Sequence, residues 1–218
     1  MTTPCRDLNE LNELVKAMLE LAIVDIKKQG VNPLVVETYR TKERQNYLYC
    51  QGRGVAECTA KGIDKTFATK YCNTKVGKVT WTLNSEHFNR KAVDLVPQRL
   101  VSGKMTAIWN SKDKQTQIII KTMQKYGFEA GANWTTTPDS PHFQVKGNFS
   151  NKFTKTNNTI YVTQAIQKAL NSKVDAKLVV NGVWDNKTTD AINKFLKSRG
   201  AKITLGQIDK DAYKELMK

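Results

Sequence analysis

Histidine is scarce in this sequence: only His87 and His142 occur among 218 residues. No apolar run approaches the roughly 18 residues that a membrane-spanning helix needs. The N-terminal segment MTTPCRDLNELN lacks the basic and apolar regions of a secretory signal peptide. These absences predict a cytoplasmically made chain without a membrane span. If it works outside the membrane, another factor must release it.

Cysteine is also sparse, and the complete set is Cys5, Cys50, Cys58 and Cys72. None of these residues forms a C-x2-C pair, so their spacing argues against a cysteine zinc site. Reduced, structural thiols are the simpler interpretation. In an oxidising compartment Cys58 and Cys72 could pair across a loop, and the sequence leaves their redox state open.

Acidic residues are outnumbered: 35 Lys and Arg stand against 20 Asp and Glu, for a formal net charge of +15. The excess is spread along the chain without the basic block that marks a tail or arm. Such a surface suits a polyanionic partner, either nucleic acid or an anionic cell wall. The sequence shows no zinc-finger, RNP or P-loop pattern, which argues against nucleic acid.

Periodicity indicates an α+β fold, because helices and strands occur without regular β-α-β alternation. Apolar residues at helical or alternating spacing predict the following elements. The helices are 8–28, 41–52 and 113–126, and the strands are 34–39, 79–83, 92–96 and 141–145. Residues 53–78 are rich in Gly, Lys and Thr and predict a long loop that frames a cleft.

A polar segment, 149–158, predicts a linker between a first domain, 1–148, and a second, 159–218. The second part contains three short helical patterns, typical of a small all-α three-helix domain. We expect Trp184 in the core of that domain.

Each histidine has an aspartate nearby, in SEHFNRKAVD and in PDSPHF. A catalytic zinc site needs three protein ligands and an open position for water, and His87, Asp94 and His142 are suitable ligands. Asp139 could act as general base on the water. Spacing alone leaves open the alternative that both histidines are surface or capping residues.

The residues around these positions resemble the motifs of a zinc peptidase family. Ser85-x-His87-x4-Ala92-x-Asp94 is similar to S-x-H-x-x-G-x-A-x-D of the LAS metallopeptidases, which include D-alanyl-D-alanine carboxypeptidases and L-alanyl-D-glutamate endopeptidases. WTTTPDSPHF resembles the family's W…D/E-x-x-H-F, and Tyr39-Arg40-Thr41 begins a third similar stretch that ends at QGR. The resemblance covers roughly residues 34–145.

The resemblance implies one Zn²⁺ ion in an α+β domain with a small antiparallel sheet and flanking helices. It also implies roles for six residues: His87, Asp94 and His142 as zinc ligands, Asp139 as catalytic acid/base, Arg40 as oxyanion or substrate partner, and Ser85 as substrate-binding residue.

Two departures from the motifs affect the site. Arg90 stands where the family usually has Gly, so a positive φ there would mean strain or a reshaped loop. The arginine could also face carboxylates of the substrate. Asp139 replaces the commoner Glu and is one methylene shorter, which would change the distance from metal to base.

The C-terminal part resembles the three-helix peptidoglycan-binding domain through Asn181-Gly182-Val183-Trp184 and Thr188, Ala191 and Phe195. Asn181 and Asp185 depart from that pattern, where Asp and Gly are usual. The alternative is an accessory helical domain without affinity for the wall.

Together the resemblances predict a monomeric, phage endolysin-like zinc peptidase that cuts peptidoglycan stem peptides between L-Ala and D-Glu for host cell lysis. Its partners would be peptidoglycan and anionic wall polymers, and not nucleic acid. It would be made in the host cytoplasm and reach the wall after membrane permeabilisation. The alternatives are a bacterial D,D-carboxypeptidase acting on terminal D-Ala-D-Ala, usually exported, and a non-catalytic zinc-containing wall-binding protein.

Overall fold

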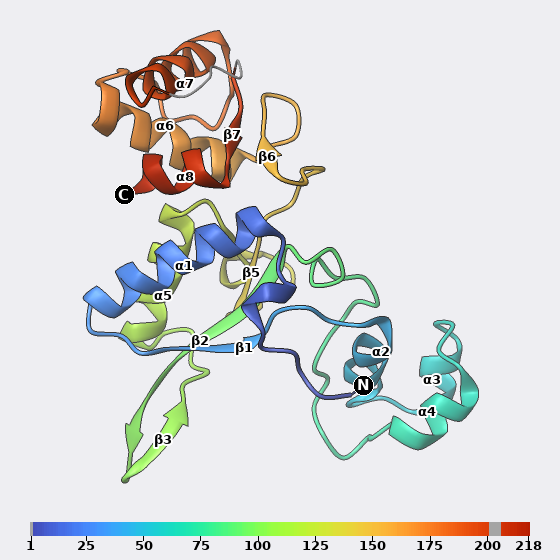
Figure 1. Cartoon of the computed structure of the whole chain (residues 1–218). Helices are drawn as coiled ribbons and strands as arrows, with labels where there is room; N and C mark the ends of the chain where they lie inside the picture. The colour runs from blue at the N-terminus through green and yellow to red at the C-terminus, as the bar shows by residue number, and fades with distance from the viewer. Residues whose placement is uncertain (1, 201–205) are drawn as a thin grey trace.

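The computed structural model describes residues 2–200 and 206–218 (Figure 1). Its main sheet is antiparallel and runs in the order β1-β2-β5-β4, with β3 paired to the outer part of β2. The strands are β1 (Pro33–Glu37), β2 (Ala92–Val101), β3 (Lys104–Ala107), β4 (Glu129–Ala130) and β5 (His142–Gln144). This small sheet with flanking helices confirms the predicted α+β class.

Two helices, α1 (Glu13–Lys28) and α5 (Lys114–Lys125), lie side by side against the sheet (Figure 1). The Asn12 side chain caps α1 by accepting hydrogen bonds from two backbone N–H groups of its first turn. The two helices and the sheet bury one shared set of apolar side chains: Leu14, Met18, Ala22, Ile26, Val93, Leu95, Ile119, Met123 and Phe143. This core fixes the strands on which the site is built.

The segment predicted as a long loop contains two short helices, α3 (Val55–Thr59) and α4 (Lys65–Tyr71), so that prediction was wrong in part. They pack beside α2 (Lys42–Cys50) around a small second core, away from the sheet (Figure 1). Their apolar side chains face this local core, and both helices are too short to show clear periodicity.

The predicted strand 79–83 does not form. Val79 and Trp81 are exposed, and the carbonyl of Thr82 accepts a hydrogen bond from Gln45 Nε2 at 2.7 Å. The Gln45 side chain therefore takes the hydrogen-bonding position at Thr82 O that a neighbouring strand would occupy.

The C-terminal part holds α6 (Ile160–Val174), α7 (Asn186–Ser198) and α8 (Lys210–Met217), together with a two-stranded ribbon of β6 (Lys152–Phe153) and β7 (Ile208–Asp209). Aspartate or threonine side chains cap all three helices. Trp184 is buried, as predicted, and its indole N–H donates to Thr189.

Helix α8 joins this part to the rest of the chain by packing on α1 (Figure 1). The buried hydroxyl of Tyr213 donates to the Tyr126 carbonyl at 2.8 Å, and Lys214 pairs with Glu20 at 2.9 Å. Phe149 and Phe153, from the segment predicted as a linker, are buried in the same continuous core. The two parts therefore share one apolar interior.

Over the described ranges, no helix combines the length and the apolar character that crossing a membrane requires.

Candidate metal centre

Strand pairing brings two of the predicted ligands together. Asp94 on β2 lies directly opposite His142 on β5 in the antiparallel register. His87 comes from the turn that precedes β2. One ligand atom from each residue lies within 4.8 Å of the other two, so residues 48 and 55 positions apart converge on one point.

The ring contacts of the histidines show that this point suits a metal. His87 Nδ1 contacts the carbonyl oxygen of Thr38, and His142 Nε2 lies 3.1 Å from Gln144 Oε1. In the neutral rings each outer nitrogen therefore carries the proton, which leaves the lone pair of the inner nitrogen for a metal. Those inner nitrogens, His87 Nε2 and His142 Nδ1, lie 3.2 and 3.3 Å from Asp94 Oδ1.

Two imidazole nitrogens and one carboxylate oxygen are a donor set suited to catalytic Zn²⁺, which keeps one position open. Both histidines are buried, and the Asp94 side chain is 13% exposed. The residues present therefore fit one zinc ion, which His87 Nε2, Asp94 Oδ1 and His142 Nδ1 would hold.

A second layer of side chains holds the ligands and was not found from the sequence. Gln144 donates from Nε2 to Glu129 Oε2 at 2.9 Å, and Trp134 donates to Glu129 Oε1 at 2.7 Å. Gln144 could have been found, because it lies two residues after His142 and shares its face of the strand. Glu129 gives no comparable signal, since it meets Gln144 only through β4–β5 pairing.

The electrostatics follow from these contacts. Burial alone would raise the pKa of Asp94, but His87 and His142 outweigh it and hold that pKa well below its usual range. Burial also disfavours a charged His142, yet the hydrogen bond and charge of Asp94 raise the pKa of His142 overall. Asp94 therefore stays ionised as a ligand, and a proton competes with metal at His142.

Arg40 reaches the centre through Asp94. It lies just after β1, and its Nη2 donates to Asp94 Oδ2 at 2.9 Å. Nε and Nη2 both contact Glu37 Oε2, and Nη1 donates to Gln45 at 3.0 Å. The buried guanidinium is thus fixed by three side chains while it lines the cleft.

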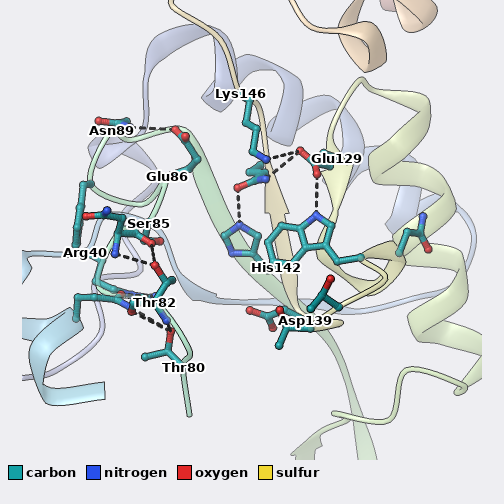
Figure 2. A pocket seen from close by; sticks show the side chains of 18 of the residues that line it. Arg40, Thr80, Thr82, Ser85, Glu86, Asn89, Glu129, Asp139, His142 and Lys146 are labelled. Atoms are coloured by element: carbon teal, nitrogen blue, oxygen red, sulfur yellow. Dashed lines mark hydrogen bonds and ion pairs between the residues drawn. The ribbon is translucent and has the colours of Figure 1, made fainter. Parts of the chain in front are cut away.

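Asp139 lies in the loop before β5 and lines the cleft beside His142 (Figure 2). Its backbone N–H donates to Gly131 O at 2.9 Å. A Cβ at Gly131 would approach Asp139 O to 2.5 Å, so only glycine lets the loop lie this close to His142. Desolvation by the surrounding residues and the negative charge of Asp94 raise the pKa of the Asp139 carboxyl, although Asp139 is exposed to solvent.

The cleft has a volume of about 880 Å³. Ser85 lines it, and its Oγ accepts a hydrogen bond from the His87 N–H at 3.4 Å. Thr80 and Thr82 continue the lining on the Ser85 side, and Glu129 and Lys146 lie on the opposite side (Figure 2). All six predicted site residues therefore lie at or beside one cleft.

Arg90 is not among the residues that line this cleft, and whether it faces substrate carboxylates stays a prediction. Its φ is 60°, the left-handed conformation that the usual glycine adopts easily. Its guanidinium pairs with Glu10 and lies 4.4 Å from the centre of the Tyr39 ring. Arg90 thus adopts the backbone conformation of the usual glycine, and its side chain binds the N-terminal segment at Glu10.

Residues 78–145 match the sequence family described as D-alanyl-D-alanine carboxypeptidase. This segment contains His87, Asp94, Asp139 and His142, and the match confirms the resemblance to zinc peptidases. The match covers less than half of the chain, and together with the donor set it makes the chain similar to zinc-dependent peptidoglycan peptidases.

Three solved structures are similar to parts of this chain. The Serratia marcescens L-Ala D-Glu endopeptidase ChiX shares 21% identity at a TM-score of 0.39, with 64% of this chain and 83% of that chain covered. The LdcB LD-carboxypeptidase shares 18% at 0.40, covering 62% and 58%. The D,D-pentapeptidase VanY from a VanB-type resistance cassette, in complex with Zn(II), shares 22% at 0.36, covering 60% and 69%.

Proposed function

We propose that this chain is an endopeptidase that cuts peptidoglycan stem peptides between L-Ala and D-Glu. The observation that carries the proposal is the convergence of two tautomer-fixed histidines and Asp94 beside the Asp139 carboxylate, inside an open cleft. The lining continues on both sides of this point, from Thr80 to Lys146 (Figure 2). Substrate residues on both sides of a scissile bond therefore have room, as an endopeptidase requires.

In this proposal the chain's residues divide the chemistry among them. Bound Zn²⁺ would polarise the scissile carbonyl and lower the pKa of the attacking water. Asp139 accepts the proton of that water and delivers it to the leaving amine. Arg40 holds Asp94 in place and presents a fixed positive charge to the side of the cleft where negative charge develops. Ser85 contributes a hydroxyl at the same wall.

The C-terminal part, 159–218, would bind the wall. It forms three helices with a buried Trp184, as the resemblance to a peptidoglycan-binding domain implies. Residues 151–218 carry 13 basic and 6 acidic side chains, which favours anionic wall polymers as additional partners. With both activities, the chain would serve as a phage lysis enzyme that reaches the wall after membrane permeabilisation.

Digestion of purified peptidoglycan tests the function directly, with product masses read by mass spectrometry. Peptides with a new N-terminal D-Glu, formed only without chelator, would support the endopeptidase. Release of terminal D-Ala alone would instead assign a D,D-carboxypeptidase. Intact peptidoglycan, with zinc bound and the wall retained in a pull-down, would show a binding protein.

A further inference from the structure

A second group of metal-ligating atoms lies outside the cleft, where α2, α3 and α4 meet. Cys50 is the last residue of α2, Cys58 lies within α3, and Cys72 directly follows α4. Their three sulfur atoms all lie within 4.8 Å of one another. Cys50 and Cys58 are fully buried, and Cys72 is partly exposed. We propose that these three thiols bind a second, structural Zn²⁺ ion.

The number of converging thiols favours a metal over a disulfide. Around tetrahedral zinc with Zn–S distances of about 2.3 Å, sulfur atoms lie about 3.8 Å apart. Three sulfurs already within 4.8 Å need only a small closure to occupy three corners of that tetrahedron. A disulfide would use two of them and leave the third without a function. Thiolates are also soft ligands that suit zinc, unlike Mg²⁺ or Ca²⁺, which prefer oxygen ligands.

The fourth coordination position of the ion would lie on the exposed side, near Cys72. No fourth His, Cys, Asp or Glu ligand atom joins this group within the part of the chain that the structure describes. Because Cys72 is the one member open to solvent, a water molecule could complete the coordination on its side, as it does in zinc sites with three protein ligands. The widely spaced Cys50, Cys58 and Cys72 form the group only through the fold, which explains why a search for C-x2-C pairs misses it.

This region depends on a small local core and a few side-chain contacts, such as the bond from Arg53 to the Tyr49 carbonyl. Its core is separate from the main core and has five buried members: Tyr49, Cys50, Cys58, Ile63 and Ala68. Helices α3 and α4 have 5 and 7 residues, far below the length at which a helix is stable alone. Metal binding would add to the free energy of folding of this segment, because the ligands come together only in the folded segment.

The site would also stiffen one wall of the cleft. Gln45, one turn and a half before Cys50 on α2, donates to Thr82 O and accepts from Arg40. After Cys72 the chain pairs back at Asn73 with Gln51, and then runs directly to Thr80 and Thr82. A metal that ties Cys72 to Cys50 would therefore hold α2, which carries Gln45, against the segment that leads to Thr80 and Thr82.

The test is metal content and spectroscopy of the full-length chain, neither of which depends on peptidase activity. We expect two zinc ions per chain, one after His87→Ala with His142→Ala, one after Cys58→Ser with Cys72→Ser, and two after the control Cys5→Ser. Replacement of zinc by Co²⁺ should give an intense sulfur-to-cobalt charge-transfer band. That band should persist in the histidine variant and be absent from the cysteine variant.

The cobalt band of the unmodified chain is decisive even if the cysteine variant fails to fold. Absence of the band, with Co²⁺ bound at one equivalent, would overturn the proposal. A mass two hydrogens below the reduced value under non-reducing conditions would also overturn it, in favour of a disulfide. One bound ion per unmodified chain, with the sulfur-to-cobalt band present, would contradict the proposed peptidase and still support the cysteine site.

Discussion

Arg40 and Asp94 are joined through the carboxylate oxygen that does not face the histidines. Arg40 Nη2 donates to Asp94 Oδ2 at 2.9 Å, whereas Asp94 Oδ1 lies 3.2 Å from His87 Nε2. The guanidinium therefore sets the rotation of the carboxylate and leaves Oδ1 as the ligand atom. This contact gives Arg40 a positioning role beside the substrate role that its motif implies.

Arg40→Lys should therefore weaken zinc binding as well as catalysis. A lysine cannot hold Glu37, Gln45 and Asp94 at once, and loss of such a supporting contact typically lowers metal affinity about 10- to 100-fold. Competition with a chromophoric chelator measures the affinity. Arg44→Lys is the matched control, because Arg44 pairs with the same Glu37 at 3.0 Å. Unchanged affinity with a reduced kcat would restrict Arg40 to the substrate.

Asp139→Asn should retain zinc and lose activity. The amide keeps the size of the side chain but cannot accept the proton, so kcat should fall about 10²- to 10⁴-fold. Zinc content and the rate of peptidoglycan cleavage are measured on the same sample. Asp139→Glu restores the commoner residue and should keep measurable activity. Normal turnover by the asparagine variant would remove Asp139 from the mechanism.

Acidification should release zinc from the cleft. Asp94 raises the pKa of His142 above its ordinary value of 6.5, despite burial, and zinc needs the neutral ring. Affinity should therefore decline as the pH falls through that raised pKa. A titration of zinc affinity from about pH 8 to pH 5 checks this, and constant affinity over the range would argue against histidine ligation.

The metal-free chain should show the opposite trend in its stability. A raised folded-state pKa means that the charged His142 contributes stability below about pH 6.5, and that this contribution is lost as the pH rises through the folded value. Urea unfolding of the chelator-treated chain measures it. His142→Gln should flatten this part of the profile, and an unaltered profile would place the titration elsewhere.

Arg90 provides a test of backbone strain. A non-glycine residue in the left-handed region costs about 1–2 kcal/mol, and contacts with Glu10 and Tyr39 offset about 1 kcal/mol. Arg90→Gly should thus leave the free energy of unfolding within about 1 kcal/mol of the original. Arg90→Ala keeps the strain without the contacts and should be the least stable of the three. Equal stability of the Gly and Ala variants would contradict the strain.

The shared core predicts that both parts of the chain unfold together. Trp184 is the sole tryptophan beyond residue 134, so replacing the other three by Phe gives a C-terminal fluorescence probe. Its transition in urea should coincide with far-UV circular dichroism. Tyr213→Phe should lower the unfolding free energy by about 1 kcal/mol through loss of the bond to Tyr126, and Tyr161→Phe is the control. Two separate transitions would mean independent domains.

The sequence predicts those parts of the fold that repeat a local pattern. Helices α1 and α5, strands β1, β2 and β5, and the buried Trp184 all follow from apolar periodicity. The segment 79–83 alternates like a strand, but Gln45 takes its backbone carbonyl and no strand forms. Strand β4 has two residues, too few to show any alternation.

The candidate site divides in the same way. The candidate ligands and Asp139 belong to short sequence motifs, so the sequence alone indicates them. The fold brings them together. Glu129 and the role of Arg40 toward Asp94 depend on contacts between distant segments, which no local pattern encodes. The clustering of Cys50, Cys58 and Cys72 is of the same kind.

The register of β2 on β5 has a consequence for folding. Asp94 faces His142 in one alignment of the two strands, and a shift by a single residue would turn one of these side chains to the opposite face. Zinc can bind only the correctly aligned pair. During synthesis or refolding, the ion would therefore stabilise only the correct register of β2 on β5. That register is also the one that forms the metal centre.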